Sequence, residues 1–179
     1  LTNEAKPLLE LFHHGRRCIS INPDSYDGRR QFEDFIFSNF GNHLRGKPRL
    51  MKMNTQAYSD QSTAFISIAS NASLDTFADA TGTAPSNRRF RINIITNADK
   101  AFAEADMIGK TFRCGKALVV VHKPVGRCAA INVDPETALR SDRDYVRLMR
   151  EKFGHSNLGV FAKVIKGGEV RVGDELHLI

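Results

Sequence analysis

Residues 159–179 read GVFAKVIKGGEVRVGDELHLI, a pattern of short strands separated by tight turns. The β-branched and aliphatic residues fall into short runs. We expect strands at 159–165, 169–172 and 175–179. The dipeptides Gly167-Gly168 and Gly173-Asp174 separate these runs, and both are typical of tight turns. Short strands with glycine turns and few helices favour a β-barrel with helices around it.

The remainder of the chain mixes strands and helices, so the expected fold class is mixed α/β and mainly β. A hairpin is expected around Gly15, with strands at 7–13 and 16–22. Further strands are expected at 64–69, at 89–96, within 111–121 as a hairpin turning at 114–116, and at 128–133. Helices are expected at 28–40, 71–80 and 141–153, where apolar residues recur at helical spacing.

Cap residues indicate where these helices begin and end, because their side chains or glycine conformations satisfy the free backbone groups there. The expected caps are Asp27 and Gly41 for the first helix, Ser70 or Asn71 and Gly82 for the second, and Ser141 with Asp144 for the third. The stretch DPET at 134–137 is expected to be a turn, bonded by Asp134 and Thr137.

The composition is that of a globular domain. Hydrophobic residues make up 41% and charged residues 26%, which argues against a disordered or coiled-coil chain. No apolar run approaches the roughly 20 residues of a membrane helix, so no membrane partner is expected. The net charge is +6. This modest excess fits a nucleic acid partner, an anionic cofactor or solubility alone.

The three cysteines, Cys18, Cys114 and Cys128, are widely spaced and odd in number. No CxxC pattern or close Cys/His pair occurs, so neither a disulfide framework nor a zinc finger is expected. A reducing cytoplasm is the simplest setting for such a chain. No HExxH or HxH pattern is present, which argues against a histidine-based zinc enzyme.

Cys128 is the strongest candidate for chemistry. It directly follows Arg127, and a nearby fixed cation favours the thiolate, the form that binds metals and attacks electrophiles. Gly126 would let a ligand approach the backbone closely. A small buried core residue is the alternative, as is a nucleophilic pair with His122 or His155.

Arg91 and Asn93 are two residues apart in the expected strand at 89–96, so their side chains are expected on the same face. That face is either solvated or a donor-rich surface for a heterocycle or phosphate. The basic clusters 88–91 and 45–52 favour a solvated face or an anionic cofactor over a nucleic acid duplex. Glu104 and Asp106 lie close together and are expected to be solvated on a turn.

Four ordered segments together resemble the MOSC domain, named after the C-terminal domain of molybdenum cofactor sulfurase. They are FRINII at 90–95, EADMIGK at 104–110, PVGRCAAINVDPET at 124–137 and FGHSNLGVFAKVIKGGEVRVGDEL at 153–176. The resemblance runs from about Asp60 to the C-terminus. It implies a MOSC-type β-barrel with a few peripheral helices over residues 54–179, preceded at 1–53 by the remnant of an N-terminal β-subdomain.

The resemblance also implies a ligand, the molybdenum cofactor (Mo-molybdopterin), which is a pterin dithiolene with a phosphate tail. In family members that reduce N-hydroxylated compounds, the cysteine of the Arg-Cys motif coordinates molybdenum, and here that residue is Cys128. A soft thiolate suits a metal already held by dithiolene sulfurs. The implied cofactor-binding residues are Asp60, Arg91, Asn93, Gly126 and Arg127.

Three departures from the family pattern stand out. Met107 replaces a common tryptophan, and Ala138 replaces a common glycine. The Lys-Ser and Arg residues that hold the cofactor phosphate in longer relatives have no counterpart in residues 1–50. We therefore expect the chain, which begins at Leu1, to be most of a longer protein.

The expected function is an oxidoreductase that reduces N–O bonds in a small-molecule substrate. Electrons would come from an external donor such as a ferredoxin, a flavodoxin or a cytochrome-type reductase, because the cysteines lack cluster spacing. A non-catalytic carrier of the cofactor or of sulfur, using Cys128, is the alternative. A basic nucleic-acid-binding barrel is the least favoured.

Overall fold

The computed structural model describes residues 8–52, 61 and 63–179. The chain divides into two compact units, Leu1–Thr55 and Gln56–Ile179. The expectation that residues 1–53 are the remnant of a β-subdomain stays a prediction.

The first unit is a hairpin followed by a helix. Its strands, β1 (Leu9–His13) and β2 (Arg16–Ile21), pair antiparallel, which confirms the expected hairpin around Gly15. Helix α1 (Tyr26–Phe40) ends at Gly41 as expected, and a 3-10 turn, η1 (Gly41–His43), follows. The expected cap Asp27 is wrong: the helix begins two residues earlier, and Ser25 Oγ accepts from the backbone N–H of Gly28 at 3.0 Å.

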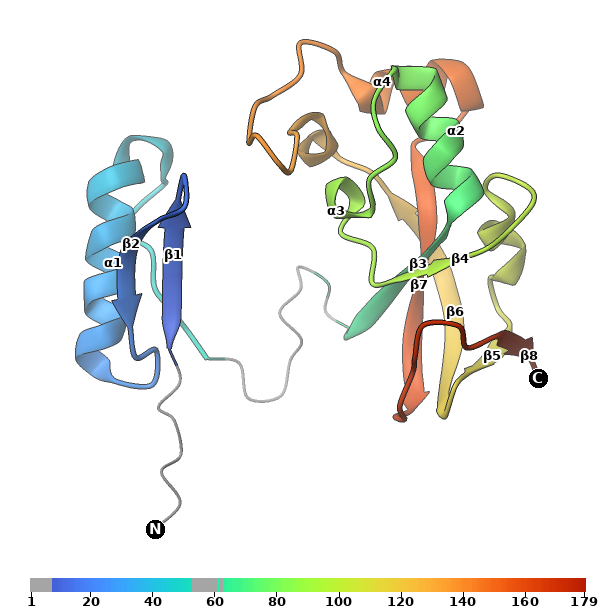
Figure 1. Ribbon diagram of the computed structural model, residues 1–179, viewed down its shortest axis with the longest axis horizontal. Coiled ribbons are helices and arrows are strands. Elements are labelled where there is room, and N and C mark those ends of the chain that lie inside the picture. The colour runs from blue at the N-terminus through green and yellow to red at the C-terminus, as the bar shows by residue number, and fades with distance from the viewer. Residues whose placement is uncertain (1–7, 53–60, 62) are drawn as a thin grey trace. The chain divides into compact units, whose positions relative to one another are not determined.

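The second unit is built on one curled, six-stranded sheet with the strand order β4-β3-β7-β6-β5-β8 (Figure 1). Its strands are β3 (Phe65–Ser70), β4 (Ile94–Thr96), β5 (Thr111–Cys114), β6 (Ala117–Gly126), β7 (Asn157–Lys166) and β8 (Leu176–Leu178). Only β3 and β4 pair in parallel; the other neighbours are antiparallel. The sheet forms a half-barrel, and the expected mixed α/β, mainly β fold is confirmed.

Helices gather at one end of this sheet (Figure 1). They are α2 (Asn71–Thr81), α3 (Asn87–Phe90) and α4 (Tyr145–Phe153), with the 3-10 helices η2 (Ala103–Met107) and η3 (Ala129–Asn132). None of the helices in the described residues is both long enough and apolar enough to span a membrane.

Two apolar clusters stabilise the second unit. One joins α2, α3, η3 and α4 to β3 and β7, and it consists of Ala69, Leu74, Phe77, Phe90, Ile92, Ile131, Tyr145, Val146, Met149 and Leu158. The other joins the strands of the curled sheet to one another, and it consists of Ile68, Phe112, Val119, Val121, Val160 and Ala162. Burying such side chains contributes about 1.5–3 kcal/mol each. The first cluster therefore holds the helices, α3 included, against the start of β7, and the second holds the strands together.

Several local expectations are confirmed. Ser70 caps α2, since its Oγ accepts from the backbone N–H of Ser73 at 3.1 Å, and Gly82 ends that helix with φ +68°. The hairpin of β5 and β6 turns at the expected place. Helix α4 begins after Asp144, which accepts from the N–H groups of Val146 and Arg147, so the predicted start at residue 141 was too early.

Three predicted strands are wrong in whole or in part. The stretch 89–96 begins with the last two residues of α3, and only Ile94–Thr96 is strand. The stretch 128–133 holds the 3-10 helix η3, with Cys128 and Val133 as its caps. Residues 169–172 form no strand; the chain there turns through Gly173 into β8. Each of these stretches is apolar enough for a strand but is fixed by contacts with distant residues.

Candidate functional site

Cys128 lies just beyond the end of β6. Gly126 is the last residue of that strand and pairs with Asn157 of β7, and the backbone N–H of Arg127 donates to Ser156 O at 2.8 Å. Cys128 is extended, with φ −110° and ψ 176°, and its carbonyl accepts from the N–H of Ile131 in η3. The strand end and the 3-10 helix together fix its backbone and leave its side chain at the surface.

The three cysteines differ in accessibility. Cys114 is buried, and burial followed by the negative charge of Asp174 raises the pKa of its thiol. Cys18 is exposed on β2 in the first unit. Cys128 is the exposed cysteine of the second unit, and its thiol has no hydrogen bond to any described residue. It is therefore the thiol of this unit that is open to a ligand.

Arg127 anchors the end of β6 with its side chain. Its Nε donates to Leu158 O at 2.9 Å, its Nη1 donates to Phe90 O at 2.9 Å, and its Nη2 also donates to Leu158 O. The guanidinium lies 5.2 Å from the centroid of the Phe90 ring. The arginine thus joins β6, β7 and α3 at one point.

Burial lowers the pKa of Arg127 to about 10, while the charges of Cys128 and Glu104 act in the opposite direction. The acceptors that contact the guanidinium are neutral carbonyls, so its positive charge is not cancelled by contact. A positive charge beside Cys128 favours an anionic ligand there.

The space above Gly126 is open. A Cβ added to this glycine would meet only Asn157 Oδ1, at 3.7 Å, which is ordinary van der Waals contact. The packing of the chain itself therefore does not require glycine here. The opening lets a ligand lie against the backbone beside Cys128.

Arg91 and Asn93 lie in different environments from each other. Arg91 ends α3 with φ +53° and exposes a side chain that makes no hydrogen bond or ion pair with the described residues. Arg91 directly follows Phe90, whose carbonyl accepts from Arg127 Nη1, so the backbone of Arg91 is connected to the Cys128 site. Asn93 instead turns its Oδ1 to β3, where it accepts from the N–H of Ser67 at 2.9 Å. Asp60 lies outside the described residues.

Two charged residues expected to be solvated are buried. Glu104 is only 4% exposed, although Asp106 on the same 3-10 helix is exposed as expected. The side chain of Arg89 is 5% exposed and pairs with Asp134 at 2.8 Å. Neither burial has a signal in the local sequence, since Glu104 lies in a stretch that resembles an exposed turn and Arg89 lies in a basic cluster at the start of an expected strand.

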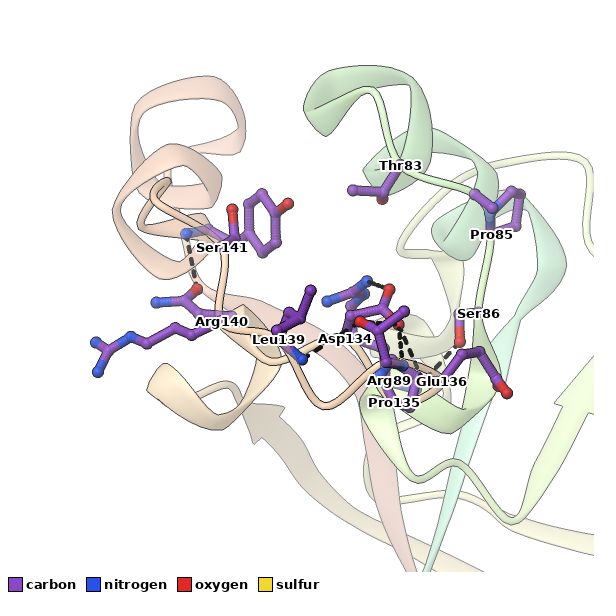
Figure 2. A pocket seen from close by; sticks show the side chains of 14 residues that line it. Thr83, Pro85, Ser86, Arg89, Asp134, Pro135, Glu136, Leu139, Arg140 and Ser141 are labelled. Carbon is purple, nitrogen blue, oxygen red and sulfur yellow. Dashed lines mark hydrogen bonds and ion pairs between the residues drawn. The ribbon is translucent and has the colours of Figure 1, made fainter. Parts of the chain in front are cut away.

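Arg89 and Asp134 border a cavity of about 490 Å³ (Figure 2). Thr83 and Pro85 form one wall, and Leu139 and Ser141 form the opposite wall. The expected DPET turn is confirmed: Asp134 Oδ1 accepts from the N–H groups of Glu136 and Thr137, at 2.9 and 3.0 Å. These bonds hold the pKa of Asp134 below its ordinary value.

A larger cavity of about 840 Å³ lies between β4 and the segment 170–176. It is bordered by Asn93 and Thr96 on one side and by Arg171 and Asp174 on the other. Ile94 of β4 and Leu176 of β8 also border it, so the cavity lies between the two edge strands of the curled sheet. Cys128 borders neither cavity, so its thiol is reached from the open surface.

The donor set fits a metal held mainly by a bound cofactor. Within the residues that the structure describes, no three His, Cys, Asp or Glu side chains gather as they would around a metal ion. A metal at Cys128 would therefore take its other ligands from a bound group. A single soft thiolate beside a cation, an open glycine and an unpaired Arg91 fit an anionic group of that kind.

Comparisons with solved structures give low overall similarity. The crystal structure of YiiM from Escherichia coli is 21% identical with a TM-score of 0.49, and the match covers 75% of this chain and 65% of YiiM. YiiM from Geobacillus stearothermophilus is 16% identical with a TM-score of 0.45, covering 64% of this chain and 53% of that one. A hypothetical protein is 21% identical with a TM-score of 0.47, covering 63% and 50%. The chain thus spans 50% to 65% of the lengths of these proteins.

No curated protein matches the chain. The sequence model of one family, the MOSC domain, matches residues 55–177. That stretch contains the curled sheet except for the last residue of β8, both cavities and the end of β6 with Arg127 and Cys128. The chain belongs to the MOSC domain family.

Proposed function

We propose that this chain binds the molybdenum cofactor, with Cys128 as the protein ligand to molybdenum, and that it reduces N-hydroxylated small molecules. The observation that carries the proposal is the exposed Cys128 thiol, held at the end of β6 beside the half-buried guanidinium of Arg127. The MOSC family is associated with molybdenum-cofactor-related function, and the match covers this region.

Each residue at the site has a separate part in the proposal. The Cys128 thiolate binds the metal, since thiolates are soft ligands. Arg127 holds the strand end in place and supplies positive charge to an anionic ligand. Gly126 leaves room at the backbone, and Arg91 offers an exposed cation for the anionic part of the cofactor. Asn93 and Asp60 complete the proposed set of cofactor-binding residues. Asn93 would donate to the cofactor through its side-chain Nδ2, because its Oδ1 already accepts from the backbone N–H of Ser67.

When bound, the cofactor would supply the two-electron redox chemistry that cleaves an N–O bond. The overall reaction takes two electrons and two protons, converts an N–OH group into N–H, and releases water. The electrons are proposed to come from an external protein donor of the ferredoxin, flavodoxin or cytochrome-reductase type. A reducing compartment such as the cytoplasm would keep the Cys128 thiol available.

A second candidate is a carrier of the cofactor or of sulfur. The observation that favours it is that Cys128 opens to the surface and borders neither cavity. A thiol in such a position can pass a bound group to another protein without a substrate pocket beside it. In this case Cys128 would hold a persulfide or release the cofactor to a partner.

The test compares Cys128→Ser with Cys18→Ser, which removes the exposed thiol of the other unit. Both variants are loaded with cofactor and analysed for molybdenum and pterin, and an amidoxime is offered with a reduced viologen dye as donor. Cys128→Ser should lose molybdenum-dependent reduction and retain the thermal unfolding midpoint, while Cys18→Ser keeps both. Reduction that survives Cys128→Ser overturns the role of this residue as metal ligand.

Two further results separate the candidates. Wild-type protein that binds molybdenum and pterin without reducing the amidoxime, and that carries a persulfide on Cys128, supports the carrier. Protein that takes up neither molybdenum nor pterin under loading conditions, and that carries no persulfide on Cys128, contradicts both candidates.

A further inference from the structure

Glu104 is a buried acidic residue whose carboxyl group accepts three hydrogen bonds. Its Oε2 accepts from the hydroxyl groups of Ser70 at 3.0 Å and Ser73 at 2.9 Å, and its Oε1 accepts from the backbone N–H of Gly159 at 3.0 Å. No ion pair joins it to a basic side chain in the described part of the chain. Hydrogen bonds to an ionised group are stronger than neutral ones, so these three donors stabilise a buried carboxylate.

The third donor connects Glu104 to Arg127. The N–H of Gly159 and the carbonyl of Leu158 belong to the same planar peptide. Glu104 binds the N–H end of that peptide, and Arg127 donates to its carbonyl end through Nε, at 2.9 Å, and through Nη2. One peptide group therefore lies between a buried carboxylate and a half-buried guanidinium.

The polarity of this peptide is favourable at both ends. The positive N–H end faces the carboxylate, and the negative carbonyl end faces the guanidinium. Each hydrogen bond polarises the peptide and strengthens the other in a medium of low dielectric constant. The electrostatic interaction with Glu104 also opposes the lowering of the pKa of Arg127 that burial causes.

The peptide has little freedom to move. Gly159 has φ +79°, and a Cβ at this position would lie 2.7 Å from Ile68 O and 3.4 Å from Arg127 Nη2. The backbone of β3 and the guanidinium thus pack directly against it. A displacement of the peptide is transmitted to Arg127, and from there to the end of β6 that carries Cys128.

We propose that Glu104 is a positioning residue for the Cys128 site: by binding the peptide between Leu158 and Gly159, it fixes Arg127 beside Cys128. The inference rests on the proposed function in one respect: it takes Cys128 as the functional thiol beside which Arg127 is positioned. Ser70 and Ser73 hold Glu104 in turn, so the N-terminal end of α2 is connected to the site through four successive groups, namely the hydroxyls, the carboxylate, the peptide and the guanidinium.

The test measures hydrogen exchange of the Arg127 Nε proton by nuclear magnetic resonance on the full chain. Glu104→Ala should raise this exchange about tenfold, because it removes a charged hydrogen bond that orients the acceptor of Nε. Exchange of the Val119 amide proton, in the pairing of β5 with β6, should stay the same. Asp106→Asn, on the same 3-10 helix but exposed, is the matched control and should change neither proton.

If Glu104 only filled space, Glu104→Ala would change the exchange of the Arg127 Nε proton and of the Val119 amide proton alike. That result overturns the proposal. Glu104→Gln keeps an acceptor of the same size without the charge. It should move the Gly159 amide signal to higher field and raise Arg127 exchange less than Glu104→Ala does. If Glu104→Ala does not fold, Glu104→Gln carries the test, and unchanged Gly159 and Arg127 signals contradict the proposal.

The two proposals fail separately. If Cys128→Ser still reduces the amidoxime, the proposed function is wrong, while the exchange of the Arg127 proton still reports on Glu104. If Cys128→Ser loses molybdenum and Glu104→Ala leaves the Arg127 proton protected, only the role of Glu104 is wrong.

Discussion

Ser67 and Asn93 bind each other reciprocally across β3 and the start of β4. The side-chain oxygen of Asn93 accepts from the backbone N–H of Ser67 at 2.9 Å, and the hydroxyl of Ser67 accepts from the backbone N–H of Asn93 at 3.1 Å. Ser67 is 6% exposed, so its own polar groups have little access to water, whereas Asn93 is exposed. The pair fixes the point at which the chain leaves α3 and enters the sheet.

Asn93→Ala should lower the free energy of unfolding by about 1–3 kcal/mol, because it leaves a buried N–H without an acceptor. Urea unfolding measures the change. Asn97→Ala, at an exposed position just after the same strand, is the control and should stay within about 0.5 kcal/mol of the wild type. If Asn93→Ala and Asn97→Ala are equally stable, the hydrogen bond from the Ser67 N–H to Asn93 contributes nothing to the free energy of unfolding.

Gly159→Ala should lower the free energy of unfolding by about 3 kcal/mol. The left-handed conformation contributes one part of this cost, and the close approach of the new Cβ to Ile68 O contributes the other. Gly82→Ala isolates the first part, since Gly82 has φ +68° and no atom within 4 Å of an added Cβ. It should cost about 1 kcal/mol. A Gly159→Ala variant no less stable than Gly82→Ala would contradict the close packing of this peptide.

Ala138→Gly should stabilise the protein by about 0.5–1 kcal/mol. Ala138 has φ +58°, a conformation that an L-amino acid adopts at a cost and glycine adopts freely. This is also the position at which the family pattern favours glycine. Ala130→Gly, in η3, is the control and should destabilise by about 0.5–1 kcal/mol, because its conformation needs no glycine. Thermal and urea unfolding should show that Ala138→Gly raises the free energy of unfolding and that Ala130→Gly lowers it.

Asp134 should make stability depend on pH in the acid range. Hydrogen bonds from the backbone of Thr137 and Glu136 hold its pKa below the ordinary value of 3.8. Because the pKa is lower in the folded state, its contribution is fully present above about 3.8 and is lost as the pH falls through the folded value. The difference in unfolding free energy between wild type and Asp134→Ala should therefore shrink below pH 4.

Asp142→Ala provides the comparison for that measurement, since Asp142 is exposed and makes no hydrogen bond with described residues. It should leave the free energy of unfolding nearly unchanged at pH 7. A difference for Asp134→Ala that stays constant from pH 7 to pH 2.5 would mean that the carboxylate does not bond the DPET turn.

Signals that act within a few residues were predictable. Gly82, and either Ser70 or Asn71, were predicted as the ends of α2, because a capping side chain reaches only about three residues along the chain and a left-handed terminus requires glycine or its equivalent. The hairpins around Gly15 and Gly115 follow from the same kind of local chemistry. The Arg-Cys motif likewise marked Cys128 without help from the fold.

Hydrogen bonds between distant residues decided the stretches that were mispredicted. Residues Ala129–Asn132 form a 3-10 helix, and Arg89 Nη1 donates to Ile131 O at 3.0 Å and to Val133 O at 3.1 Å. In addition, Asn132 Oδ1 accepts from the backbone N–H of Tyr145 at 2.9 Å. A short apolar run has no periodicity that distinguishes a strand from a helix, so its sequence could not reveal this.

The role inferred for Glu104 was out of reach for the same reason. Its partners Ser73, Ser70 and Gly159 lie 31, 34 and 55 residues away in the chain. A carboxylate next to Asp106 in a charged stretch resembles an exposed pair, and only the folded chain brings three donors to one of the two. A charged side chain can be buried only where the folded chain brings hydrogen-bond donors to it. A single sequence does not show which distant residues will supply those donors.

The curled sheet is not closed, yet it offers little template for another chain. Unpaired backbone groups on a long, flat outer strand recruit strands from neighbouring molecules and lead to aggregation. Here the two outer strands, β4 and β8, are only three residues long each. An incoming strand could form very few hydrogen bonds with either of them. The half-barrel can therefore stay open to solvent along its gap without promoting edge-to-edge association of neighbouring molecules.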